Sequence, residues 1–257
     1  MMDDILSERA RDGSPSADLP RRAIILAGGK GRRLYPFTAT IPKPLLPVWD
    51  TPVVEVMIRT LVSQGLTDIT LAVNHFADLI VSYFGDGQRL GARLGHLRES
   101  REMGTAGPLS LLPLWTGDML VSNGDILTDI DIARMQAAHK RASAAITIAS
   151  ITRQVRSDSG VLHVDDEDNL LEIQEKPVRA ERISIGIYIV NESVRRFLPQ
   201  GRPLEMPTLI ERCLAAGLRV IAYPHEGIWL DIGRPEDYAR GQSDEAIGAL
   251  IQRLMTR

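Results

Sequence analysis

Residues 23–44 read AIILAGGKGRRLYPFTATIPKP, and we expect the rest of the chain to be built around them. A short apolar run ends at Gly28 and Gly29, which is typical of a buried parallel strand followed by a glycine-rich turn. Because Gly28, Gly29 and Gly31 lack a Cβ, the backbone N–H groups of this turn can approach an anion closely. The cationic side chains that follow are Lys30, Arg32, Arg33 and Lys43. A backbone cradle with this density of positive charge predicts a polyphosphate site.

The simplest alternative for this segment is a surface turn with solvated charges, which its position directly after an apolar strand disfavours. Two commoner phosphate motifs do not fit. The dinucleotide fingerprint G-x-G-x-x-G would need a glycine where Leu34 stands. The Walker motif needs Gly-Lys-Ser or Gly-Lys-Thr, and neither tripeptide occurs in the chain. The expected phosphate loop is therefore of another type.

The segment resembles the signature of the sugar-phosphate nucleotidyltransferases, which are also called nucleoside-diphosphate-sugar pyrophosphorylases. That signature runs L-A-G-G-x-G-T-R-L-x-P-x-T and continues with x-P-K-P; here it stands as residues 26–34, Pro36, Thr38 and residues 42–44. Arg32 stands where the family usually has Thr or Ser. The resemblance implies catalytic roles for Arg33 and Lys43. It also implies a nucleotide site that includes Leu26, Ala27, Gly28, Gly29, Gly31, Arg32 and Arg33.

Composition and charge exclude several functions. A formal net charge of −3 and a pI near 6.0 argue against nucleic acid or an anionic membrane as partner. The single cysteine, Cys213, excludes an intramolecular disulfide and fits a reducing compartment. No apolar run approaches the roughly 18 residues of a membrane span, and no signal peptide is evident. We therefore expect a cytoplasmic protein.

The first 20 residues differ from the rest of the chain. They are rich in acidic residues and in Ser and Pro, with little to bury, which predicts a mobile N-terminal extension. The whole chain contains 44% hydrophobic residues, enough for residues 21–257 to form a sizeable core. We expect them to form one nucleotidyltransferase domain.

Strands and helices alternate after the phosphate loop. A helix is expected from Pro52 with an apolar stripe, followed by a strand at 68–73, a helix at 76–83 and a strand at 94–98. This pattern predicts an α/β fold with a doubly wound, mainly parallel, Rossmann-like sheet and right-handed crossovers. Ligands bind such sheets at the carboxyl ends of the strands, where the glycine-rich turn is placed.

A second glycine-rich turn, Gly104-Thr105-Ala106-Gly107, precedes an apolar helix expected through Leu112. On its own it is as readily a turn that begins a helix as a binding site. In the family resemblance, Gly104, Thr105 and Ala106 lie against the nucleobase. GTAG is the form associated with guanylyltransferases, so the resemblance implies GTP.

The strand expected from Asp118 ends in the polar turn Asn123-Gly124-Asp125. A carboxylate beside a phosphate loop suits Mg²⁺, which prefers one or two carboxylates, water and substrate phosphates. An N-cap or an Asx turn is the alternative. By resemblance, Asn123 and Gly124 contact the nucleotide, and Asp125 is a catalytic residue that binds the metal. Asp231, in the Trp-Leu-Asp-x-Gly motif that begins at Trp229, is implied as the second metal ligand.

Short strands are expected at 144–151, 160–164, 170–174 and 183–190, after a helix at 130–140. They predict a small antiparallel insertion that packs beside the main sheet. Its motif is Glu175-Lys176-Pro177, which without context reads as exposed charges at a turn. By resemblance, Glu175 contacts sugar hydroxyls and Lys176 is a catalytic residue on the sugar phosphate. The remaining sugar-phosphate residues implied are Gly160, Ser184, Gly186 and Trp229. Related sequences read Asn-Ala-Gly where this chain has Ser184-Ile185-Gly186, which leaves the sugar open.

The last third of the sequence predicts a helix at 205–216, a strand at 218–223 and a terminal helix capped at Ser243. The apolar stripe of the terminal helix is expected to pack either on the domain or on a second subunit. A homodimer is therefore one of two alternatives. The histidines show no metal-ligand spacing, and no G-x-S-x-G elbow occurs.

The resemblance implies nucleotidyl transfer from a nucleoside triphosphate, GTP, to mannose 1-phosphate or a related hexose or heptose 1-phosphate, with Mg²⁺. One alternative is the same reaction with dTTP, UTP or CTP and glucose 1-phosphate. Another is a catalytically silent subunit that binds a nucleotide sugar and regulates a partner. The presence of Arg33, Asp125, Lys176 and Asp231 favours the enzyme.

Overall fold

The computed structural model describes residues 19–256, and the mobile extension expected at residues 1–18 lies outside this range. Leu19 and Pro20, which the sequence placed in that extension, are buried. Leu19 packs with Leu61 and Leu66 in the larger hydrophobic core. The folded unit therefore begins at least two residues earlier than expected.

A central seven-stranded sheet has the order β12-β8-β11-β6-β1-β4-β5. All neighbouring strands are parallel except β11, which is antiparallel to both β6 and β8. The sheet consists of β1 (Arg22–Leu26), β4 (Asp68–Val73), β5 (Arg93–Arg98), β6 (Asp118–Asn123), β8 (Ile146–Arg156), β11 (Val178–Asn191) and β12 (Val220–Pro224). The expected doubly wound, mainly parallel sheet is confirmed.

Helices cover both faces of the sheet. The α-helices are α2 (Val53–Ser63), α3 (Ala77–Phe84), α4 (Ile132–Ala142), α5 (Met206–Ala215), α6 (Pro235–Ser243) and α7 (Glu245–Met255). In β1, Ile25 packs into the core that contains residues of α2, α3 and α4, and Ile24 packs into a second core that contains residues of α5. Both side chains are fully buried. Burial on both faces explains why residues 23–26 of β1 are continuously apolar in sequence.

Short elements connect these layers. The small antiparallel pairs are β2 (Pro47–Val48) with β3 (Thr51–Pro52), and β7 (Ile126–Thr128) with β13 (Trp229–Asp231). The 3-10 helices span Arg32–Leu34, Phe37–Ala39, Lys43–Leu45, Gln88–Leu90, Gly107–Leu111 and Glu192–Phe197. One of these replaces the helix expected through Leu112. Leu112 is extended because Pro113 follows it, and a residue before proline disfavours the helical region.

The C-terminal region forms two helices instead of one. The cap of α7 is Asp244, whose carboxylate accepts a hydrogen bond from the N–H of Ala246 at 3.0 Å. The expected cap, Ser243, ends α6 and donates to the carbonyl of Ala239 at 3.2 Å. The apolar stripe of α7 packs on the domain itself, in a third core with Val53 and Val56 of α2.

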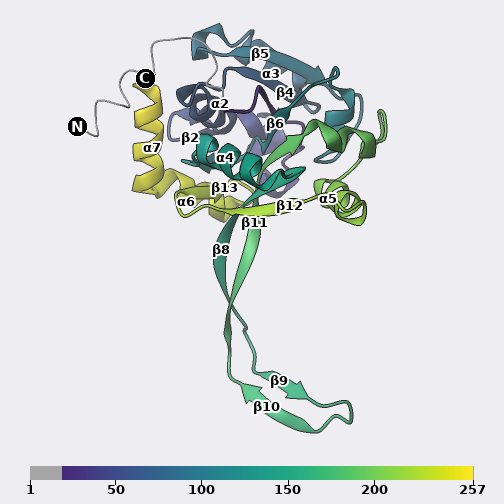
Figure 1. Cartoon of the computed structure of the whole chain (residues 1–257). Coiled ribbons are helices and arrows are strands. Elements are labelled where there is room, and N and C mark those ends of the chain that lie inside the picture. The colour runs from purple at the N-terminus through teal and green to yellow at the C-terminus, as the bar shows by residue number, and fades with distance from the viewer. Residues whose placement is uncertain (1–18, 257) are drawn as a thin grey trace, which may run out of the picture.

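The antiparallel insertion forms an arm that extends away from the body (Figure 1). Strands β8 and β11 pair continuously from Ile151 opposite Ile183 to Arg156 opposite Val178, well beyond the rest of the sheet. A separate hairpin of β9 (Val161–Val164) and β10 (Leu170–Gln174) lies at the far end. The expected packing of this insertion beside the main sheet is wrong, because the continuous β8–β11 ladder directs it outward.

Within residues 19–256, no helix combines the length and apolar character that a membrane crossing requires.

Candidate active site

The glycine-rich turn after β1 borders a cavity of about 460 Å³. The N–H of Ala27 donates to the carbonyl of Ala72 at 2.8 Å, which holds the start of the turn beside β4. Gly28 lies against the neighbouring loops so closely that a Cβ there would come within 2.9 Å of Glu99 Oε1 and 3.2 Å of Asn74 Cβ. Only glycine fits this position without displacing the cavity wall.

Most residues expected to bind the nucleotide line this one cavity. They are Leu26, Ala27, Gly28, Gly29, Gly31, Arg32, Arg33, Gly104, Thr105, Asn123 and Gly124, and Lys43 and Asp125 join them. Ala106 is the exception, because it is fully buried in the core that contains Ile24. Its N–H donates to the carbonyl of Leu204 at 2.8 Å, so it supports the wall of the cavity from behind.

The Gly104–Gly107 turn is held by the segment that begins α5. Thr105 donates its hydroxyl to Glu205 Oε2 at 2.9 Å and accepts a hydrogen bond from the N–H of Met206 at 2.7 Å. The N–H of Gly107 donates to the carbonyl of Leu204 at 2.9 Å. These bonds fix one wall of the cavity across about 100 residues of sequence.

Asp125 and Asp231 come together although they are distant in sequence. Asp231 ends β13, where it pairs with Ile126 of β7, and the N–H of Ile232 donates to the carbonyl of Asp125 at 2.9 Å. Lys43 forms an ion pair with Asp125 Oδ2. The expected carboxylate pair is therefore present beside the phosphate loop.

The electrostatics of this pair suit a divalent cation. Asp125 Oδ1 and Asp231 Oδ1 are buried, and neither has a hydrogen-bond partner among the described residues. Burial, and then the negative charge of Asp125, raise the pKa of Asp231 to about 6, against the opposing charges of Lys43 and Arg33. Two buried oxygens without partners in a repulsive pair fit Mg²⁺, which takes one or two carboxylates and completes its shell with water and phosphate oxygens.

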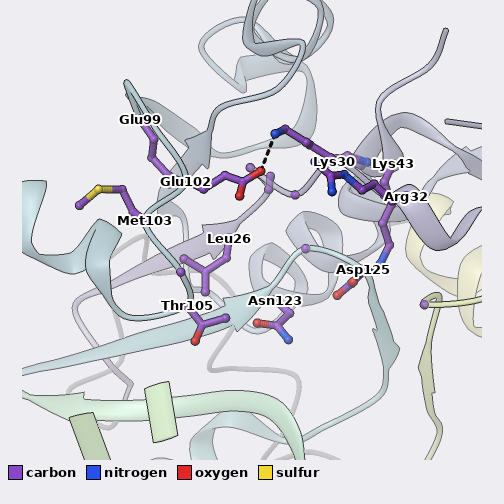
Figure 2. A pocket seen from close by; sticks show the side chains of 18 of the residues that line it. Leu26, Lys30, Arg32, Lys43, Glu99, Glu102, Met103, Thr105, Asn123 and Asp125 are labelled. Atoms are coloured by element: carbon purple, nitrogen blue, oxygen red, sulfur yellow. Dashed lines mark hydrogen bonds and ion pairs between the residues drawn. The ribbon is translucent and has the colours of Figure 1, made fainter. Parts of the chain in front are cut away.

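Charge is divided across the cavity (Figure 2). Lys30, Arg32 and Lys43 lie on the side near Asp125, whereas Glu99 and Met103 lie on the opposite side. Lys30 forms an exposed ion pair with Glu102 at 2.7 Å. The cationic side matches a triphosphate, which leaves the side with Glu99 for the rest of a nucleotide.

Several cavity residues were missed by the sequence analysis. They are Pro44, Glu99, Glu102, Met103, Glu205 and Gly233. Glu99 is half-buried; burial raises its pKa, and a hydrogen bond from the N–H of Met103 opposes this. For Glu99 and Glu102, their position shortly before the Gly104 turn was a local sequence signal that could have identified them as cavity residues. Glu205 had none, because only tertiary packing brings it to Thr105.

The residues expected to bind the sugar phosphate divide into two groups. Ser184, Gly186 and Trp229 lie at the root of the arm. A Cβ at Gly186 would come within 2.5 Å of Asn123 Nδ2, so Gly186 borders the cavity residue Asn123. Trp229 donates from Nε1 to the carbonyl of Ile185 at 3.3 Å.

The second group, Gly160, Glu175 and Lys176, lies at the far part of the arm. Gly160 is beside Glu175, since a Cβ there would be 3.3 Å from Glu175 Oε2. Both charged residues are exposed and follow directly after β10, which projects away from β6 and β13 (Figure 1). The structure does not bring this group to the Asp125–Asp231 pair within one copy of the chain.

A glycine-rich turn at the carboxyl edge of a doubly wound sheet, beside two partly buried carboxylates, is an arrangement typical of nucleotide-binding domains. Comparison with known proteins specifies the class. The family model described as Nucleotidyl transferase matches residues 22–246, and the chain belongs to this family.

Curated relatives include enzymes with different nucleotides. A UTP–glucose-1-phosphate uridylyltransferase of Synechocystis is 34% identical over 237 residues, covering 84% of this chain and 61% of that protein. A mannose-1-phosphate guanyltransferase of Candida albicans is 34% identical over 229 residues, covering 86% and 63%. The chain spans less than two thirds of the length of these relatives.

Solved structures confirm the fold. A putative glucose-1-phosphate thymidylyltransferase from Bacillus anthracis superposes with a TM-score of 0.70 at 27% identity, covering 88% of this chain and 95% of that one. HddC from Yersinia pseudotuberculosis gives a TM-score of 0.69 at 23% identity, covering 88% and 99%, and supports the fold alone.

Proposed function

We propose that the chain transfers a nucleotidyl group from a nucleoside triphosphate, GTP, to a sugar 1-phosphate, either mannose 1-phosphate or a related hexose or heptose 1-phosphate. The products are the nucleotide sugar and pyrophosphate. One observation carries the proposal: Asp125 and Asp231 present buried, unpartnered oxygens beside a cavity lined by Gly28–Gly31 and Lys43. Family membership and the curated guanylyltransferases support the same reaction class.

The reaction is an in-line displacement at the α-phosphorus of the triphosphate. An oxygen of the sugar phosphate forms a bond to that phosphorus, and the bond to the oxygen that bridges to the β-phosphate breaks. No covalent enzyme intermediate is needed, because the attacking oxygen is already anionic. Catalysis then depends on alignment and charge neutralisation.

Residues of the cavity divide these tasks. Mg²⁺, held by Asp125 and Asp231, supplies positive charge to the phosphates when bound. The amides of the Gly28–Gly31 turn and Arg33 hold the leaving pyrophosphate. Lys43, fixed by its ion pair with Asp125, assists at the phosphates. The hydrogen bonds of the Thr105 hydroxyl with Glu205 and with the N–H of Met206 keep the opposite wall of the cavity in place.

Glu99 supports the choice of GTP over UTP and dTTP. Guanine presents two adjacent donors, N1–H and N2–H₂, which one carboxylate can accept together. Uracil and thymine present a single N–H between two carbonyls, which a carboxylate would repel. Glu99 is a half-buried carboxylate on the side of the cavity away from the cations. It is therefore placed to favour guanine.

The test is a matrix of substrates read by pyrophosphate release. GTP, ATP, UTP, CTP and dTTP are each combined with the 1-phosphates of mannose, glucose, glucosamine, galactose and a manno-heptose. We expect GTP to lead by at least about 10-fold in kcat/KM. A lead for UTP or dTTP would support the alternative nucleotides, which are those in the names of the Synechocystis and Bacillus anthracis relatives. The absence of pyrophosphate release with every pair of substrates would favour a binding subunit and overturn the proposal.

A further inference from the structure

The hairpin at the end of the arm has an exposed apolar face. Leu162 pairs with Ile173 and Val164 pairs with Leu170 across its two strands, so the four side chains share one face. Their exposed fractions are 58%, 61%, 48% and 58%, respectively. An isolated two-stranded hairpin is marginally stable in water. This face therefore needs a covering surface, which the body of the same copy does not provide in this conformation.

The hairpin leads directly into an unusual lysine. Lys176 is the only Lys or Arg in residues 157–177. It adopts φ +45°, a strained backbone conformation for a residue with a side chain, which is characteristic of functional positions. Its ammonium has no hydrogen-bond or ion-pair partner among the described residues. An exposed, unpaired cation held in a strained turn is suited to an anionic ligand.

The arm extends from the same edge of the sheet as the cavity, so it can reach the cavity of a second molecule. Because β11 is antiparallel to both β6 and β8, strands β6 and β8 run the same way. The arm therefore leaves the sheet at the carboxyl edge, which is also the edge that carries Asn123 and the cavity. Two copies that face each other with these edges would lay each arm beside the cavity of the other.

The surfaces that would meet are complementary. Tyr35, Phe37 and Ile41 are exposed apolar residues on the loop that joins the cavity residues Arg33 and Lys43. They offer a surface for the apolar face of the hairpin. The hairpin is strongly acidic, with Asp158, Asp165, Asp166, Glu167, Asp168, Glu172 and Glu175. The β8–β11 ribbon carries Arg153, Arg156, Arg179 and Arg182 against the single acid Glu181, so acidic hairpins and basic ribbons of two crossing arms attract each other.

We propose that the arm acts in trans in a two-fold dimer of this chain. The hairpin of each copy packs over the cavity of the other, and Glu175 and Lys176 complete the sugar-phosphate site beside the Asp125–Asp231 pair of the second copy. The inference rests on the proposed function, because it assigns Lys176 to the phosphate of the sugar substrate. A two-fold arrangement makes the exchange reciprocal, so both sites are completed at once.

Mixing two inactive variants tests this arrangement. Asp125→Asn and Lys176→Ala carry different affinity tags and are co-expressed. The mixed dimer is isolated by purification through both tags in succession. A second sample is left as the random mixture of all dimers. If the arm acts in trans, a mixed dimer contains one site with both wild-type residues and one site with both substitutions. A random mixture then recovers about one quarter of wild-type activity. If the arm bends back over its own cavity, each site of the mixed dimer keeps one defect and no activity returns.

The matched control mixes Asp125→Asn with Asp231→Asn. Both residues belong to the body of the same copy, so this mixture stays inactive whichever way the arm acts. Activity in the mixture of Asp125→Asn with Lys176→Ala, together with no activity in the control mixture, would establish that the arm acts in trans. An active wild type whose Asp125→Asn and Lys176→Ala mixture stays silent would overturn the inference and leave the proposed function standing.

Sedimentation velocity supplies a readout that does not depend on activity. We expect wild-type dimers, and we expect Ile173→Asp to shift the population toward monomer at the same protein concentration. Leu114→Asp is the control, because Leu114 is 80% exposed but lies outside the arm. A wild-type chain that is monomeric at all concentrations would exclude the dimer. A wild type that dimerises through the hairpin yet releases no pyrophosphate would count against the proposed function instead.

Discussion

At the scale of single residues, two carboxylates from distant parts of the chain are central to the chemistry proposed for the cavity. Asp125 follows β6 and Asp231 ends β13, and the pairing of β13 with β7 brings them together. Their Oδ1 atoms are buried without hydrogen-bond partners among the described residues.

The metal pair gives the first prediction. We expect Asp231→Asn to lower turnover by about 100-fold or more, because the cation loses a charged ligand. The metal-free variant should unfold at the same temperature as the wild type or higher, because the substitution removes repulsion from Asp125. Pyrophosphate release at saturating Mg²⁺ and thermal unfolding with a chelator measure the two effects. Asp86→Asn is the control for both, because Asp86 is exposed in the body and its oxygen accepts a local hydrogen bond from the N–H of Gln88, which an amide oxygen can also accept. Near wild-type turnover of Asp231→Asn would remove this residue from the site.

The second prediction concerns nucleotide choice. We expect Glu99→Gln to lower the ratio of kcat/KM for GTP to kcat/KM for UTP by about 10-fold, because an amide can accept only one of the two guanine donors and presents an NH₂ to the other. Glu102→Gln is the matched control, since Glu102 is exposed and pairs with Lys30. An unchanged ratio in Glu99→Gln would place the base elsewhere in the cavity.

The sequence predicted these residues of the candidate site unequally. Residues 26–33 could be predicted to line one cavity, because the spacing of glycines and cations is itself a local signal. The pairing of Asp125 with Asp231 could be inferred only through resemblance to a family, because two strands of a small sheet bring them together. Ala106 was wrongly predicted to line the cavity, because the sequence does not show which residues of a turn face inward.

At the scale of elements, sequence patterns predicted strands and helices well where each packs on the body. The helix at 205–216 and the strands at 68–73 and 94–98 lie within one residue of α5, β4 and β5 at each end. The arm was not predicted, because alternating apolar residues indicate a strand with one covered face but do not show what covers it. The packing of the hairpin depends on contacts outside the described chain or on bending of the ribbon.

The third prediction concerns the start of β6, where one carboxylate joins three elements. Asp118 accepts hydrogen bonds from Gln136 at 2.6 Å and from Asn191 at 2.8 Å, and His139 lies at 3.3 Å. Burial acts to raise the pKa of Asp118, but hydrogen bonds with His139, Asn191 and Gln136 outweigh it and hold the pKa well below its usual range. We expect Asp118→Ala to lower the free energy of unfolding by about 1–3 kcal/mol at pH 7.

The sign of the pH dependence follows from the lowered pKa. The stabilisation is complete above the ordinary aspartate pKa of 3.8 and is lost as pH falls toward the lower pKa of the folded protein. Urea unfolding of wild type and Asp118→Ala at pH 7 and pH 2.5 measures it, and the difference between them should shrink in acid. Asp68→Ala breaks a surface ion pair with Arg93 and should cost less than about 1 kcal/mol. An equal loss in both variants would refute the role of the Asp118 network.

At the scale of the whole molecule, the proposed function assigns the nucleotide to the body and part of the sugar-phosphate site to the arm. The cavity, the cations and the carboxylate pair all belong to the body. Gly160, Glu175 and Lys176 belong to the arm. This division predicts that the nucleotide site is complete without the arm, whereas the sugar-phosphate site is not.

An arm-truncated chain tests the division. Arg156 and Val178 are direct partners in the β8–β11 ladder, so an Asn-Gly turn can join them in place of residues 157–177. We expect this chain to bind Mg²⁺–GTP within about 3-fold of the wild type in equilibrium dialysis, because the cavity is untouched, and to lose kcat/KM for the sugar 1-phosphate by about 100-fold or more. The full-length Lys176→Ala variant, in which the arm is intact, should show most of the same loss in kcat/KM for the sugar 1-phosphate. If the truncated chain still formed the nucleotide sugar within about 10-fold of the wild-type rate, the arm would have no part in the sugar site of either copy.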